Sequence, residues 1–260
     1  MSISLRLLPE REPKPRQKGI SMVMDKGLGM NQARDLMETA AHLTDYIKLG
    51  FGTSIAGNDP REKIRLYRDN GIKVYVGGTL FEAFMIRGQA DDYVRFLDWL
   101  DVDAAEISDG SMRMEHAQKC EWIEKLSKTR TVLSEIGAKD AGVVLEHQKW
   151  VEEMALELQA GSRLVIAEAR ESGTVGIYHD SGKADTDLIS RILKEIPAEK
   201  IMWEAPIKSQ QVWFINKLGA SVNLGNIAPA DIVPLETLRL GLRGDTFFSF
   251  LPEDLQAYKL

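Results

Sequence analysis

The feature that most constrains this chain is a set of eight short apolar runs, each of which contains or stops at a charged residue, an asparagine or a glycine. Such runs are typical of parallel strands, because helices cover them from outside. In sheets of this kind the functional groups gather where the strands end. The runs are Ile20–Met24, Tyr46–Leu49, Ile72–Val76, Ala104–Ile107, Thr131–Ile136, Leu164–Ala167, Lys200–Trp203 and Ser221–Leu224.

The segments between these runs place apolar residues at the three-to-four-residue spacing of amphipathic helices. Strand and helix therefore alternate at spacings of roughly 25 to 35 residues, the pattern of a parallel sheet wrapped by helices. Eight repeats favour a closed barrel over an open doubly wound sheet, whose glycine fingerprint is absent after the first run. The length of 260 residues suits one barrel, and no linker divides the chain. We predict an α/β fold in which residues 1–260 form a single (β/α)8 TIM barrel, with 1–18 as an extended N-terminal lead-in.

The charge balance excludes some classes of partner. The chain carries 33 Lys and Arg against 39 Asp and Glu, a net charge of −6, which argues against nucleic acid or a membrane surface as the main partner. A local pocket of cations can still bind a small anion. With Cys120 as the one cysteine, and with neither a signal peptide nor a membrane-spanning run, we expect a cytoplasmic protein. Tryptophans on the outer helices can pack between barrel helices or between subunits, and since barrels often associate we expect a homo-oligomer.

The first two strands end in residues suited to anions. Asp25 and Lys26 stand beside two glycines, which either bring the backbone close to a ligand or simply form a tight turn with a surface ion pair. Lys48 lies inside an apolar run, where a lysine needs an anionic partner unless it reaches the rim. The loop that follows ends at Ser54, whose hydroxyl could contact an anion. We expect Lys26, Lys48 and Ser54 to bind substrate, and Asp25 to bind metal or substrate.

Glutamates stand at or just after the ends of four strands in succession: Glu106, Glu135, Glu168 and Glu204. Carboxylates that converge on one barrel mouth repel each other unless a cation neutralises them. Oxygen ligands favour Mg²⁺, whereas the four histidines show no zinc spacing. We predict a Mg²⁺ site from these four residues, although each glutamate alone could be a structural partner for an arginine.

Three further residues complete the predicted site. Lys139 follows Glu135 in a loop, where it would be a general acid among carboxylates or an inert surface residue. Asn223 lies in the Asn223–Asn226 motif at the end of the eighth run, and Arg243 follows the last helix beside a glycine. Late loops often form the phosphate site of a barrel, so we expect both residues to bind substrate.

Several strings of this sequence resemble the phosphosulfolactate synthase family over nearly the whole chain. They are Gly19-Ile-Ser-Met-Val-Met-Asp-Lys-Gly-Leu-Gly29, Asp45-Tyr-Ile-Lys-Leu-Gly-Phe-Gly-Thr-Ser54, Glu106-Ile-Ser-Asp-Gly110, Ser134-Glu-Ile-Gly-Ala-Lys-Asp140, Asn223-Leu-Gly-Asn226 and Leu235-Glu-Thr-Leu-Arg-Leu-Gly-Leu-Arg-Gly-Asp-Thr246. The resemblance implies a (β/α)8 barrel that adds sulfite to phosphoenolpyruvate with Mg²⁺, giving (2R)-phospho-3-sulfolactate. It implies a carbon–sulfur bond-forming lyase whose general acid is Lys139, and whose product enters coenzyme M or sulfolactate synthesis.

Two other functions are compatible with the same residues. The family also includes plant-type heat-stress-associated proteins, so the chain could be a non-catalytic member that acts through protein contacts. It could also be another Mg²⁺-dependent enzyme that acts on phosphoenolpyruvate-like substrates with a different nucleophile. Retention of Asp25, Lys48, Glu135, Lys139 and Arg243 favours the synthase.

Overall fold

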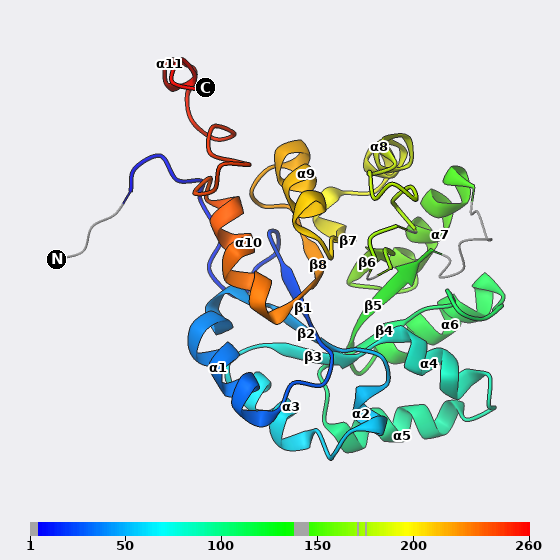
Figure 1. Cartoon of the computed structure of the whole chain (residues 1–260). Helices are drawn as coiled ribbons and strands as arrows, with labels where there is room; N and C mark the ends of the chain where they lie inside the picture. The colour runs from blue at the N-terminus through cyan, green and yellow to red at the C-terminus, as the bar shows by residue number, and fades with distance from the viewer. Residues whose placement is uncertain (1–4, 138–145, 171, 175) are drawn as a thin grey trace.

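Eight parallel strands form a nearly closed ring in the computed structural model, which describes residues 5–137, 146–170, 172–174 and 176–260 (Figure 1). The strands follow the order β3-β2-β1-β8-β7-β6-β5-β4, and β3 lies beside β4 to complete the ring. This confirms the predicted (β/α)8 barrel. The strands are β1 (Ser21–Asp25), β2 (Tyr46–Leu49), β3 (Lys73–Val76), β4 (Ala104–Ile107), β5 (Thr131–Ile136), β6 (Leu164–Ala167), β7 (Ile201–Glu204) and β8 (Leu224–Ile227).

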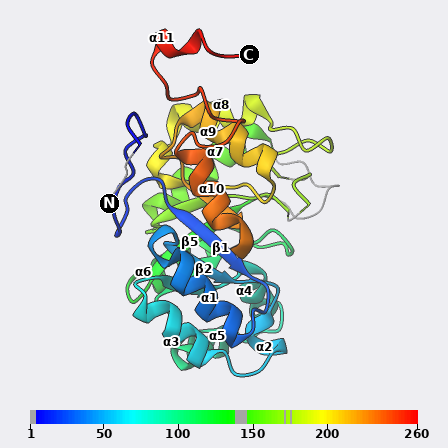
Figure 2. The ribbon, with the colours of Figure 1, turned by 60° about the vertical axis from the view of Figure 1, so that its left-hand side comes forward.

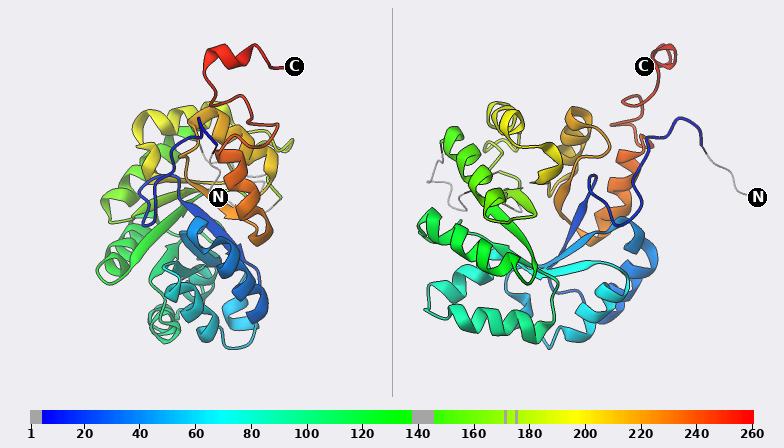
Figure 3. Two further views of the ribbon diagram at one scale, coloured as in Figure 1. Left: turned by 90° about the vertical axis from the view of Figure 1, so that its left-hand side faces the viewer. Right: turned by 180° about the vertical axis from the view of Figure 1, so that it is seen from behind.

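Helices surround the ring of strands, as Figure 3 shows from behind. Their apolar faces pack against the outward side chains of the strands, for example where Trp203 of β7 stacks on Phe214 with 5.1 Å between ring centroids. The helices are α1 (Met30–Ala40), α2 (Thr53–Ala56), α3 (Arg61–Asp69), α4 (Gly78–Met85), α5 (Ala90–Leu100), α6 (His116–Ser127), α7 (His147–Gln159), α8 (Thr186–Glu195), α9 (Lys208–Leu218), α10 (Ile232–Arg239) and α11 (Glu253–Gln256), with short 3-10 helices at Ala41–Leu43, Ala198–Lys200 and Pro229–Asp231.

The interior of the barrel is layered because alternate residues of a strand face the same side. An apolar layer fills the ring, and it consists of Ile20, Met22, Tyr46, Tyr75, Ala104, Leu133, Leu164, Ile166 and Met202. Two residues further along five of the strands, the next inward position is charged: Lys48, Glu106, Glu135, Glu168 and Glu204. The period of two therefore places one ring of charged side chains directly above the apolar layer, at the end where the strands finish.

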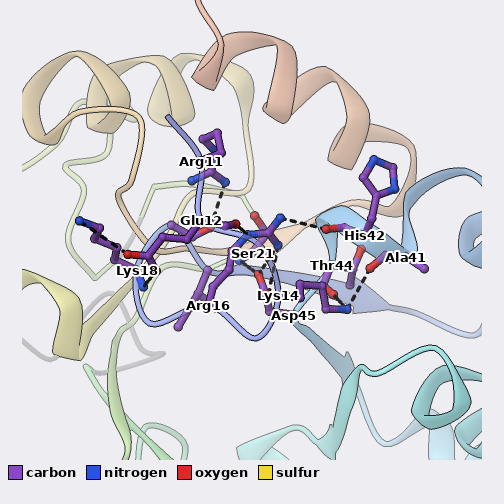
Figure 4. Close-up of polar contacts among 12 residues, drawn as sticks. Arg11, Glu12, Lys14, Arg16, Lys18, Ser21, Ala41, His42, Thr44 and Asp45 are labelled. Carbon is purple, nitrogen blue, oxygen red and sulfur yellow. Dashed lines mark hydrogen bonds and ion pairs between the residues drawn. The ribbon is translucent and has the colours of Figure 1, made fainter. Parts of the chain in front are cut away.

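The N-terminal lead-in covers the opposite end of the barrel (Figure 4). The Lys14 ammonium donates to the carbonyls of Ala41 and Thr44 at 2.9 and 2.6 Å. The Arg16 guanidinium pairs with Asp45 at 3.1 Å, and the Asp45 carboxylate also accepts from the Ser21 amide at 2.9 Å. These contacts attach the lead-in to the starts of β1 and β2.

The C-terminal segment leaves the barrel after α10, and Figure 2 shows α11 standing away from the ring of strands. No helix in the described ranges has the length and apolar character needed to cross a bilayer.

The eighth strand differs from its prediction. We expected Ser221–Leu224, whereas β8 begins at Leu224 and ends at Ile227. The register with β1 shows the reason, since Ser21 pairs with Leu224 but Val23 pairs with Ile227, so that β8 contains one extra residue. Such a bulge bends the strand and redirects one side chain. Here the redirected residue is Asn226, whose φ is 59°.

Candidate functional site

A cavity of about 510 Å³ opens at the C-terminal ends of the strands. Lys48, Glu135, Glu168, Glu204 and Asn226 come from the barrel interior, and the beginning of α4 forms part of the wall. The other lining residues are Met24, Gly50, Phe51, Gly77, Gly78, Thr79, Leu80, Ser111, Ala169, Arg170 and Ser172.

Lys48 lies among three carboxylates. Its ammonium is 2.9 Å from Glu106, 3.1 Å from Glu135 and 3.5 Å from Glu204, and all four side chains are buried. Burial by itself would lower the pKa of Lys48, but the neighbouring Glu106, Glu135 and Glu204 together hold that pKa well above its ordinary value. Lys48 is therefore a fixed positive charge whose first contacts are protein carboxylates.

Three of the four predicted glutamates come together. Glu135, Glu168 and Glu204 each place a carboxylate oxygen so that the three oxygens lie within 4.8 Å of one another. Gly137 follows β5 with a φ of +135°, and a Cβ atom there would lie 2.6 Å from the Cβ of Glu168. The glycine therefore allows the end of β5 to approach Glu168 closely.

Glu106 has a different position. Its carboxylate binds Lys48 and accepts a hydrogen bond from the backbone amide of Gly78, at the start of α4. Among the described residues it is not part of the three-carboxylate group. It orients the lysine and the helix that borders the cavity.

Burial raises the pKa of Glu204 to about 7, against the opposing effect of Lys48 and with a further increase from Glu135. The Glu204 carboxylate still accepts a hydrogen bond from the Ala169 amide at 3.0 Å. A carboxylic acid that titrates near neutrality is in balance between holding a proton and holding a cation. The donor set of this group therefore suits a hard divalent cation, since three buried carboxylates meet in the described part of the cavity.

The Asp25 carboxylate contacts the loop after β1 and two side chains of α3. One carboxylate oxygen accepts from the amides of Gly27 and Leu28 at 2.8 and 2.7 Å. The other accepts from the Tyr67 hydroxyl at 2.9 Å and lies 2.7 Å from the Lys63 ammonium. The tight-turn interpretation therefore describes its contacts, which organise the loop between β1 and α1.

The residues of the neighbouring loops lie at the edge of the cavity or beside it. Lys26 stands over the ring of Phe51, 5.7 Å from its centroid, and Phe51 lines the cavity. Ser54 instead faces a second cavity of about 460 Å³, between the β1–α1 loop and the beginning of α3. Substrate binding by Lys26 remains a prediction, and Ser54 faces away from the carboxylates.

Asn223 and Arg243 are remote from the cavity. Asn223 precedes β8, and its side chain accepts from the Ile20 amide and donates to the Ile201 carbonyl, both at 3.0 Å, at the beginnings of β1 and β7. Arg243 follows α10, whose Arg239 guanidinium donates to the Val222 carbonyl at that same end of the barrel. We therefore correct both expected placements, because one residue precedes its strand and the other follows a helix that runs back from the mouth.

The predicted general acid, Lys139, lies outside the described residues. The last described residue before it is Gly137, which directly follows β5.

The sequence profile of the (2R)-phospho-3-sulfolactate synthase family, ComA, matches residues 9–245. The chain belongs to this family. It is 44% identical over 246 residues to the phosphosulfolactate synthase of Methanothermobacter thermautotrophicus, covering 92% of this chain and 95% of the relative. It is 38% identical over 244 residues to the phosphosulfolactate synthase of Bacillus subtilis, covering 93% of this chain and 97% of the relative.

The architecture also resembles solved barrels of distant sequence. The 3-hexulose-6-phosphate synthase of Salmonella typhimurium superposes with a TM-score of 0.53 at 16% identity, over 85% of this chain and 98% of that structure. At this identity the similarity concerns the fold alone.

For three residues of this phosphosulfolactate synthase family member, the sequence analysis predicted no role. Asn226 and Arg170 line the cavity, and each belongs to a loop or bulge whose direction the apolar pattern does not reveal. Lys119 is fully buried on α6. Its ammonium lies 2.7 Å from Asp109, 2.8 Å from Glu157 and 2.7 Å from the Glu135 carbonyl. These contacts fix the end of β5 from the side of α6. A charged residue on an expected surface helix gave no signal of this role.

Proposed function

We propose that this protein is a carbon–sulfur bond-forming lyase that adds sulfite to phosphoenolpyruvate and yields (2R)-phospho-3-sulfolactate. The observation that carries the proposal is the meeting of three buried carboxylates within 4.8 Å at the mouth of a barrel of this family.

We further propose that Glu135, Glu168 and Glu204 hold Mg²⁺. A divalent ion there would stabilise the negative charge that moves into the substrate carboxylate when sulfite attacks. Lys48 and Glu106 would not bind the ion directly. They fix the positions of Glu135 and Glu204 through the lysine ammonium, which lies 3.1 and 3.5 Å from these two carboxylates.

Arg170 is the residue we assign to the phosphate of the substrate. It lines the cavity and is exposed at its rim, together with the hydroxyl-bearing Ser111 and Ser172. A guanidinium can donate two parallel hydrogen bonds to a phosphate, and nearby hydroxyls can satisfy the remaining oxygens. In this arrangement the substrate phosphate would lie near the rim. The substrate carboxylate would lie deeper in the cavity, beside the cation held by the three glutamates.

The sulfur lone pair of sulfite forms a bond to the methylene carbon of phosphoenolpyruvate, and the electrons of the carbon–carbon double bond move toward the carboxylate. A proton must then be added to the carbon that carries the phosphate. We assign that proton to Lys139 on the resemblance of the Ser134–Asp140 string, because Lys48 is held too firmly by carboxylates to release one readily.

The test is to incubate the protein with phosphoenolpyruvate, sulfite and Mg²⁺ and to follow the phosphorus NMR spectrum. A new phosphate-ester signal should grow only when sulfite and Mg²⁺ are both present, and Glu168→Gln should abolish it. The matched control is Glu195→Gln, at an exposed position of α8, which should leave the signal unchanged. Absence of a sulfite-dependent product from the folded wild-type protein would contradict the proposal and favour a non-catalytic role.

A further inference from the structure

Asn226 has an uncommon backbone conformation beside the proposed cation site. Its φ of 59° lies in the left-handed region, which few non-glycine residues enter and asparagine tolerates best together with aspartate. The residue occupies the bulge at which β8 gains one position relative to β1. The bulge directs its side chain into the cavity that Glu135, Glu168 and Glu204 also line.

Within the described part of the chain, one hydrogen bond orients the amide of Asn226. Its nitrogen donates to the Ala169 carbonyl at 3.4 Å, which leaves the Oδ1 atom on the other side of the amide. Among the described residues that oxygen has no hydrogen-bond partner, and the whole residue is only 6% exposed. A buried acceptor without a donor is costly, so its persistence calls for a ligand.

Ala169 connects this amide to the carboxylates. Its backbone amide donates to Glu204 at 3.0 Å, while its carbonyl accepts from Asn226. Ala169 also follows Glu168 directly in the chain. One residue therefore holds Asn226 in a defined relation to two of the three glutamates.

The chemistry of the cavity indicates what the oxygen would contact. Phosphoenolpyruvate and sulfite, in their fully ionised forms, offer acceptors and no donors, so neither can satisfy another acceptor. A divalent cation can, and Mg²⁺ binds amide oxygens as well as carboxylates. A neutral ligand also adds no charge to a group that already contains several carboxylates.

We propose that Asn226 Oδ1 is a ligand of the divalent cation held by Glu135, Glu168 and Glu204. This inference rests on the proposed metal site but concerns a residue that the sequence did not single out. The bulge of β8 would then serve to deliver a fourth, neutral oxygen to that site.

The experiment measures Mn²⁺ binding by titration calorimetry at pH 8 without substrate. Asn226→Gly removes the amide and suits the left-handed backbone. Its Mn²⁺ dissociation constant should rise on the order of tenfold, as when a metal site loses a supporting group. Asn226→Asp keeps an oxygen and should bind Mn²⁺ at least as tightly as the wild type. Asn216→Ala, on the exposed face of α9, should match the wild type.

The outcomes distinguish the Asn226 inference from the proposed metal site on which it rests. If the wild type binds no Mn²⁺, the proposed metal site fails, and the Asn226 inference fails with it. If the wild type and Asn226→Gly bind Mn²⁺ equally, only the Asn226 inference is overturned. It is also overturned if Asn226→Asp loses as much affinity as Asn226→Gly, since the oxygen would then be irrelevant. Should the glycine variant not fold, Asn226→Asp is compared with the wild type alone, and a tenfold loss of Mn²⁺ affinity there overturns the inference.

Discussion

Glu204 is a buried carboxylate of the cavity whose ionisation is linked to the stability of the fold. Burial raises its pKa from 4.5 to about 7, so the folded protein binds a proton more readily than the unfolded chain between these values. Without a cation, the free energy of unfolding should therefore fall as pH rises from about 4.5 to about 7, because ionising the buried group costs energy only in the folded state.

Glu204→Gln should flatten this part of the pH profile, since the amide cannot ionise. Urea denaturation of the metal-free protein at a series of pH values measures the effect, with Glu195→Gln on α8 as the control that keeps the wild-type slope. Added Mg²⁺ should restore stability to the wild type above pH 7 and do less for the variant. An identical slope in Glu204→Gln and wild type would show that another group titrates.

Lys139 is a second residue whose role can be isolated. Lys139→Ala should reduce kcat by about 10² or more, as expected when a general acid is lost, while Mn²⁺ affinity and the melting temperature stay near the wild-type values. The measurement is the sulfite-dependent turnover of phosphoenolpyruvate, with Lys128→Ala on the exposed end of α6 as the control. A near-normal kcat would remove Lys139 from the reaction.

At the scale of the elements, Asp25 joins β1 to α3 through Tyr67 and Lys63. Asp25→Ala should lower the free energy of unfolding by about 3 kcal/mol, because it leaves the Lys63 ammonium partly buried without its carboxylate. Urea denaturation tests this, and Arg34→Ala, which breaks an exposed pair with Glu62, should change nothing measurable. A stable Asp25→Ala variant that has lost Mn²⁺ affinity would instead mean that Asp25 is a metal ligand.

The elements also show what the sequence could and could not predict. Runs such as Tyr46–Leu49 and Thr131–Ile136 match their strands residue for residue, because each carries apolar residues on both its inward and its outward side. In β8 the inward position is Gly225, where a Cβ atom would lie 3.0 Å from both Met22 and Met202. The strand therefore lacks an apolar signal at that position, and the predicted run fell three residues early.

The same limitation affected the candidate site. Glutamates at strand ends were predictable because they stand where the apolar runs stop, and parallel strands end at one mouth of a barrel. The role of Asn226 was not predictable, since the direction of its side chain depends on a bulge that the apolar runs do not reveal. Arg243 was misplaced because a phosphate site was expected after the last helix, whereas that helix ends on the side of the barrel opposite the carboxylates.

In barrels of this kind, residues at the N-terminal ends of the strands contribute to stability, and residues at the C-terminal ends carry the chemistry. Arg16 and Asp45 lie in the lead-in contacts of Figure 4, at the end opposite the cavity. Arg16→Ala should lower the free energy of unfolding by about 3 kcal/mol, since Asp45 would be left buried without its main cation. The value of kcat/KM for phosphoenolpyruvate should be unchanged at 25 °C.

Thermal or urea unfolding and turnover of the same preparation measure both parts of this prediction. Lys18→Ala, whose pair with Glu12 is exposed, is the control and should alter neither property. A large loss of kcat/KM in the folded Arg16→Ala protein would show that the two ends are coupled.

The proposed reaction depends most directly on one cation at the mouth of the barrel. Crystals grown with Mn²⁺ and examined by anomalous diffraction would locate it. We predict a single strong peak within bonding distance of carboxylate oxygens from Glu135, Glu168 and Glu204. A fully occupied Mn²⁺ elsewhere, with these three carboxylates bound only to lysine and water, would contradict it.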